Sequence, residues 1–172
     1  MILRMTLLED TRQQATKHEM KHKYFADNGI KVIRSKLPVG DYANMKNMSV
    51  IIDTKKDIQE IIGNVTKGHI RFVKECELAR ENDIQLIILI EDDDVKCIDD
   101  LYKWYNWRLK ISPKATSGKT LAKILHGMEM RHGVKFEFCK KEDSGRRIIE
   151  LLGGIQHECE GAGICKDLPK SC

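Results

Sequence analysis

The sequence lacks long apolar runs, a secretion signal and a marked excess of charge of either sign. No apolar stretch in its 172 residues approaches the ~18 consecutive residues of a membrane-spanning helix, which excludes that class of protein. The amino-terminal segment MILRMTLLED has one Arg and acquires acidic residues too early for a signal peptide. We therefore expect an intracellular, cytoplasmic protein with no membrane partner.

Neither the charge nor the cysteine content points to one kind of partner. The 30 basic and 26 acidic residues leave a net charge of +4, which permits a nucleic-acid partner but equally suits a mixed-charge surface. Cysteines in a zinc knot come in pairs two residues apart, and no such pair occurs here. Without a secretion signal, we expect small buried side chains at Cys76, Cys97 and Cys139, and a tail carrying Cys159, Cys165 and Cys172.

The hydrophobic pattern predicts one α/β domain at residues 1–154, followed by a Cys- and Gly-containing tail at 155–172. The apolar run QLIILIE at 85–91 is typical of a central strand buried on both faces. Alternation and helical spacing predict strands at 3–10, 31–37, 49–55, 85–91 and 134–139, and helices at 17–28, 57–65, 69–82, 120–133 and 144–154. This order predicts a mixed sheet between helices, with an antiparallel hairpin at 31–55 and later strands parallel to a neighbour.

Two carboxylates and a lysine lie at the predicted strand ends in PVGDYANMKNMSVIIDTKK, residues 38–56. Strand alternation puts Asp53 and Lys55 on one face. A turn near residues 46 and 47 would place Asp41 across from Ile52 or Asp53, within reach of a shared ion. Because close carboxylates repel unless a proton or cation lies between them, the pattern predicts a divalent-cation site, suited to Mg²⁺ with Mn²⁺ as a substitute.

Such a site has the parts that phosphodiester hydrolysis requires. A bound metal activates water and polarises the phosphate, and Lys55 is placed to contact the phosphate or to orient the water. The carbonyl of Thr54 could also face the metal. The alternative is a surface hairpin in which Asp53 and Lys55 merely pair with each other.

The spacing GD-x₁₁-D-x-K resembles the PD-(D/E)xK nuclease superfamily, and the chain is similar to the nuclease domain of XPF-type structure-specific DNA endonucleases. That family carries D-x-R-E after a strand, then G-D, then E-R-K; the corresponding residues here are Asp10-Thr11-Arg12-Gln13, Gly40-Asp41 and Asp53-Thr54-Lys55. The similarity runs from about Leu7 to Glu91 and returns in FCKKEDSGRRIIELL. It implies a restriction-endonuclease-like fold, with a mixed central sheet flanked by helices on both faces.

The resemblance also implies the chemistry and its residues. It implies metal-dependent hydrolysis of branched or flapped DNA, in repair or recombination. Asp41 and Asp53 would bind the metal with Thr54, Lys55 would be the catalytic cation, and Asp10 a further catalytic carboxylate. The phosphate-binding candidates are Arg12, Arg71 and Lys74.

The sequence departs from the family pattern at several positions. Gln13 stands where the family has a glutamate, Gln59 where it has an aspartate, and Thr54 where it has an arginine. Glu19, on the predicted helix after the first strand, is a candidate replacement for the carboxylate missing at Gln13; a solvated glutamate is the alternative. The family's usual tandem helix-hairpin-helix elements have no counterpart after Gly154, so we expect a homodimer, a partner subunit or the loop at 105–118 to help grip DNA.

Other interpretations remain open. One is a catalytically silent DNA-binding subunit. Another is a zinc metalloprotease, because HEMKH at 18–22 spells H-E-x-x-H, although its flanks are basic and no third ligand follows. Trp104 and Trp107 could stack on unpaired bases beside Tyr102, Tyr105 and Arg108, or they could anchor the loop to the core.

Overall fold

The computed structural model describes residues 5–14 and 17–153. The expected domain boundary after residue 154 and the tail at 155–172 lie outside these residues. Within them, every helix is too short or too polar to cross a bilayer.

Six strands form one mixed sheet in the described part of the chain, with the order β2-β1-β3-β4-β5-β6. The strands are β1 (Thr6–Asp10), β2 (Lys31–Ser35), β3 (Tyr42–Asn44), β4 (Asn47–Lys55), β5 (Gln85–Glu91) and β6 (Lys135–Cys139). β1 is parallel to β2, and β5 is parallel to both β4 and β6, whereas β3 runs antiparallel to β1 and β4. The predicted mixed sheet and the parallel pairing of its later strands are confirmed.

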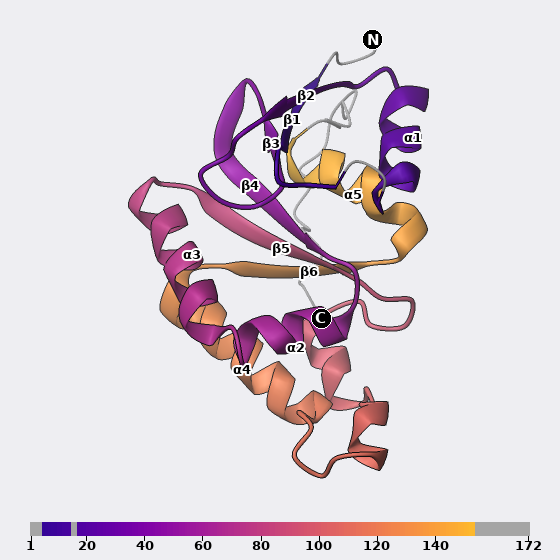
Figure 1. The fold of residues 1–172 in the computed structure, drawn as a ribbon, viewed down its shortest axis with the longest axis vertical. Coiled ribbons are helices and arrows are strands. Elements are labelled where there is room, and N and C mark those ends of the chain that lie inside the picture. The colour runs from indigo at the N-terminus through magenta and orange to yellow at the C-terminus, as the bar shows by residue number, and fades with distance from the viewer. Residues whose placement is uncertain (1–4, 15–16, 154–172) are drawn as a thin grey trace, which may run out of the picture.

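Helices cover both faces of this sheet (Figure 1). The helices are α1 (Glu19–Asp27), α2 (Ile58–Val65), α3 (His69–Glu81), α4 (Gly118–His132) and α5 (Ser144–Leu151), with short 3₁₀ helices η2 (Ile98–Tyr102), η3 (Trp107–Lys110) and η4 (Lys141–Asp143). One apolar core joins α1 and α5 to the sheet through Phe25, Ile148 and Ile149. The other joins α2, α3 and α4 to the opposite face, and its members include Ile61, Phe72 and Leu125. The predicted two-faced architecture is confirmed.

The predicted hairpin between residues 31–37 and 49–55 is wrong. β2 is an edge strand parallel to β1, because a strand that follows a helix returns beside the preceding strand by a crossover connection. The antiparallel partner of β4 is instead β3, a strand of three residues within the expected loop. Tyr42 pairs with Ile52, and the backbone N–H of Asp41 donates to the carbonyl of Ile52 at 2.8 Å. The predicted position of Asp41 opposite the end of β4 is therefore confirmed.

We expect Gly40→Ala to destabilise the fold more than Gly29→Ala. Both glycines have a left-handed φ, +64° and +67° respectively, which costs other residues about 1–2 kcal/mol. A Cβ at residue 40 would lie 2.8 Å from Cγ2 of Ile51 and 3.0 Å from the carbonyl oxygen of Ile52, whereas one at residue 29 would meet nothing within 4 Å. Overpacking typically adds about 1–3 kcal/mol.

Urea denaturation of the two variants measures this difference in the free energy of unfolding. Equal losses would contradict the close packing of Gly40 against β4.

Candidate active site

Asp53 and Lys55 form a buried ion pair at the carboxyl end of β4. Lys55 Nζ lies 2.6 Å from Asp53 Oδ2, as expected for residues two apart on one face of a strand. The exposed fractions are 6% for Asp53 and 9% for Lys55. Charges are costly at this depth, so the pair has to be compensated within the site.

Asp41, the residue immediately before β3, reaches the same strand end. Its backbone is tied on both sides, because its N–H donates to the carbonyl of Ile52 and its carbonyl accepts from the N–H of Asp10, each at 2.8 Å. Its carboxylate oxygen Oδ2 accepts from the N–H of Thr54 at 2.8 Å and from the Thr54 hydroxyl at 2.7 Å. The N–H and C=O of a strand residue face the same neighbour, so the Thr54 carbonyl also points toward the Asp41 side.

Electrostatics oppose a negative charge on Asp53. Burial raises the pKa of this carboxyl, and the negative charges of Asp41 and Glu75 raise it further, while Lys55 opposes the rise. Burial lowers the pKa of Lys55, but the charge and hydrogen bond of Asp53, together with the charge of Asp41, outweigh burial and leave the pKa of the lysine raised. One ammonium group thus faces several carboxylates, and an additional cation would relieve the imbalance.

The donor set fits a magnesium-type ion. Asp53 Oδ2 is buried and, beyond its ion pair with Lys55, has no hydrogen bond to any of the described residues. In the described ranges, no group of three or more His, Cys, Asp or Glu side chains is arranged to hold a metal. A zinc-type cage is therefore not found there, whereas Mg²⁺ commonly takes one or two carboxylates and keeps several waters. Asp41, Asp53 and the Thr54 carbonyl meet that requirement.

Asp10 is placed differently from the other two aspartates. Its Oδ1 accepts from the backbone N–H and the Nε of Arg12, at 2.9 and 2.6 Å, and its Oδ2 accepts from the N–H of Leu37 at 2.8 Å. Burial would raise the pKa of Asp10, but these hydrogen bonds lower it overall. The carboxylate therefore orients Arg12 and holds the chain that leads into Gly40 and Asp41.

Glu75 belongs to this site and is absent from the candidates that the sequence suggests. Its Oε1 accepts from the N–H of Gly40 at 3.2 Å, and its charge raises the pKa of both Asp53 and Arg12. Glu75 follows Arg71 by one helical turn on α3. Because residues at i and i+4 of a helix lie side by side, this spacing from a predicted phosphate-binding arginine could have indicated Glu75 from the sequence.

The three predicted phosphate-binding residues are brought together. Arg12, Arg71 and Lys74 line one cavity of about 390 Å³, and Lys55 and Glu75 line it as well. Arg12 comes from the loop after β1, whereas the other two lie one turn apart on α3. This cavity, which we name the lysine cavity, brings their positive charges to the same hollow as Lys55.

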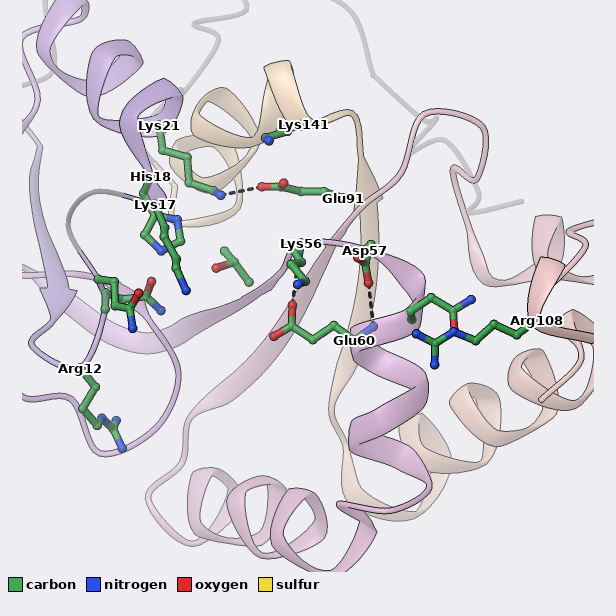
Figure 2. A pocket seen from close by; sticks show the side chains of 14 residues that line it. Arg12, Lys17, His18, Lys21, Lys56, Asp57, Glu60, Glu91, Arg108 and Lys141 are labelled. Carbon is green, nitrogen blue, oxygen red and sulfur yellow. Dashed lines mark hydrogen bonds and ion pairs between the residues drawn. The ribbon is translucent and has the colours of Figure 1, made fainter. Parts of the chain in front are cut away.

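A larger cavity of about 840 Å³, the cationic cavity, also opens at the end of β4 (Figure 2). Thr54 and Lys56 line it, as expected from their alternation with Lys55 along the chain. Its cations are Arg12, Lys17, Lys21, Lys56, Arg108 and Lys141. In Figure 2, Lys21 is paired with Glu91, at 2.5 Å, and Arg12 and Arg108 lie at opposite sides of the view.

The structure does not bring Glu19 to the aspartates. It is exposed at the start of α1, in a small cavity with Lys17, Lys21 and Lys141. Of the two histidines beside it, His22 is engaged elsewhere, because its Nε2 lies 2.6 Å from Glu9 Oε2. The ring of His18 lies edge to face with that of His22, at 6.5 Å between centroids, and lines the cationic cavity. In the part of the chain that the structure describes, H-E-x-x-H therefore forms no metal centre.

Comparison with known proteins identifies the family and the fold. Residues 10–151 match the ERCC4 domain family. No curated protein matches the sequence.

Among the solved structures with a similar fold are two of XPF from Aeropyrum pernix. XPF from Aeropyrum pernix is 16% identical, with a TM-score of 0.59 over 86% of this chain and 63% of that one. A second structure, XPF from Aeropyrum pernix in complex with DNA, is also 16% identical, with a TM-score of 0.61 over 87% of this chain and 64% of the other. This chain therefore spans less than two thirds of that protein.

The family match covers most of the chain and includes Asp10, Asp41, Asp53 and Lys55. The chain therefore belongs to the ERCC4 domain family and shares the fold of XPF from Aeropyrum pernix.

Proposed function

We propose that this domain is a Mg²⁺- or Mn²⁺-dependent endonuclease that hydrolyses DNA phosphodiester bonds, on branched or flapped DNA in repair or recombination. The observation that carries the proposal is the placement of Asp41, Asp53 and Lys55 at one strand end, where Thr54 lines one cation-rich cavity and Lys55 lines another. DNA as substrate is consistent with the cytoplasmic location expected from the sequence.

Each residue of the site would have a distinct role in hydrolysis. Asp41, Asp53 and the Thr54 carbonyl would hold the divalent cation, which when bound activates water and polarises a phosphate oxygen. Lys55 Nζ, now paired with Asp53, would turn toward the scissile phosphate or hold the attacking water. Its positive charge is fixed in a largely buried position, where electrostatic stabilisation of developing negative charge is most effective.

The two cavities provide a path for the DNA backbone. Arg12 lines both, so phosphates on either side of the scissile one can be neutralised as the strand passes the end of β4. The solved complex of XPF from Aeropyrum pernix with DNA is consistent with this use of the fold. A second copy of the chain or a partner subunit would contribute further contacts to the DNA.

A direct test is the incubation of the full chain with labelled duplex, flap, fork and four-way DNA, with Mg²⁺, Mn²⁺ or EDTA. The proposal expects cleavage with either metal and none with EDTA. A catalytically silent DNA-binding subunit would bind these substrates without cleaving them under any condition.

Asp53→Asn should abolish metal-dependent cleavage and leave folding and DNA binding largely intact. The amide keeps the volume of the side chain but removes a ligand charge that is already costly at this buried position. Single-turnover cleavage, circular dichroism and DNA affinity measure the three properties. Near-normal cleavage by this variant would refute the site assignment.

The variants Lys55→Ala and Lys56→Ala distinguish the roles of two neighbouring lysines. Lys55 lies beside Asp53, so its loss should slow single-turnover cleavage at saturating Mg²⁺ by about 10²–10³-fold, as for other preorganised electrostatic groups. Lys56 is exposed and lines the cationic cavity, so its loss should only weaken DNA binding, by an amount that shrinks as salt rises. An indispensable Lys56 with a replaceable Lys55 would contradict the mechanism.

A further inference from the structure

We propose that the segment 102–111, the aromatic segment, is a stacking platform for unpaired nucleobases of a DNA strand whose phosphates occupy the cationic cavity. The inference rests on the proposed function and specifies its substrate as DNA with a single-stranded part. It also assigns a role to side chains outside the catalytic constellation.

The aromatic segment exposes large rings to solvent. The exposed fractions are 48% for Tyr102, 57% for Tyr105 and 54% for Trp107. In Figure 1 the ribbon at these residues projects beyond α2 and α4, away from the sheet. Rings that contributed to folding would be buried against the core, as Trp104 partly is. These three are instead available to a partner.

The rings are presented on a fixed scaffold. Asn106, between Tyr105 and Trp107, is only 1% exposed. Its side-chain oxygen accepts from Gln59 Nε2 at 2.9 Å and from the N–H of Arg108 at 3.1 Å, and its amide donates to the carbonyl of Thr116 at 2.8 Å. Because the segment is held in place before a ligand arrives, binding incurs little of the ordering cost that opposes association.

Gln59 takes part in this support. Its amide donates to Asn106, so α2 helps to hold the aromatic segment in place.

The excess of basic over acidic side chains in the adjoining cationic cavity favours a nucleic acid as the partner. Arg108 lies with its guanidinium carbon 5.5 Å from the Trp107 ring centroid, and it also lines the cationic cavity. Figure 2 shows Arg108 extending beside the start of α2, across the cavity from Lys17 and Lys56. The cavity continues to Thr54, which separates Asp53 from Lys55. Phosphates along this cavity would leave the bases next to Arg108 within reach of the aromatic rings.

The platform would select unpaired nucleotides. Bases within a duplex are already stacked on their neighbours and cannot offer a face to a side chain, whereas bases of a single strand can. A fork or flap would therefore gain contacts that a blunt duplex lacks.

The first test measures binding in EDTA, where hydrolysis does not interfere. Trp107→Ala should weaken binding of a fork with single-stranded arms by about 5- to 100-fold, the range expected for a lost base–aromatic stack, and should change binding of a blunt duplex less than about twofold. Trp107→Phe should restore most of the affinity for the fork. Ile111→Ala is the matched control, because Ile111 is 76% exposed on the same segment but has no ring to stack.

The second test detects stacking directly. The chain contains 2 tryptophans, so Trp104→Phe leaves Trp107 as the fluorescent reporter. Single-stranded DNA should quench its emission, and blunt duplex at the same fractional saturation should not.

Several outcomes would overturn the inference. Trp107→Ala could weaken fork and duplex binding equally, or Ile111→Ala could weaken fork binding as much as Trp107→Ala does. Single-stranded DNA could fail to quench the Trp107 emission, or the chain could bind the matching single-stranded RNA more tightly than the DNA. A change in oligomeric state without a change in DNA binding would assign the rings to a protein interface instead. If quenching and fork selectivity appear but no metal supports cleavage, the platform stands and the proposed hydrolysis fails.

Discussion

The buried charges at the end of β4 constrain the rest of the site. Asp53 is buried beside Asp41, with Lys55 as its nearest compensating group. A side chain that serves only stability would rarely be selected at such a cost, because a buried ion pair is often no better than apolar packing of equal volume. A divalent cation bound between the carboxylates would make the arrangement favourable, and this imbalance of charge supports the proposed cation site.

The surrounding backbone and side chains fix the positions of Asp41 and Asp53. Gly40 permits the close approach to Ile51 and Ile52 that brings Asp41 against β4. Asp10 anchors the preceding chain through Leu37, and Thr54 binds the Asp41 carboxylate directly. Glu75, from a different layer, binds the N–H of Gly40. Backbone ties of this kind position carboxylates more firmly than side-chain packing alone, which metal binding and catalysis require.

Local periodicity in the sequence was sufficient to predict that Asp41, Asp53 and Lys55 lie together. The residues that it did not predict are placed by contacts between distant parts of the chain. Alternation predicts that Asp53 and Lys55 share a face, and the hairpin register predicts Asp41 opposite the strand end; both are geometric rules acting over a few residues. The prediction that residues 31–37 pair with β4 failed for another reason. Residues 31–35 and 42–44 are both suited to strands, and the crossover connection through α1, rather than composition, decides which of them pairs with β4. Glu75 and Lys141 reach their cavities through the packing of α3 and η4, which the spacing of the strand motif does not predict.

Calorimetric titration of Mn²⁺ into the full chain without DNA tests the central claim most directly, namely that the Asp41–Asp53 pair is a cation site. The account predicts saturable binding by the wild type, its loss in both Asp41→Asn and Asp53→Asn, and unchanged binding in Glu19→Gln, whose carboxylate lies exposed on α1. Binding that survives both aspartate substitutions, or that disappears with Glu19→Gln, would contradict it.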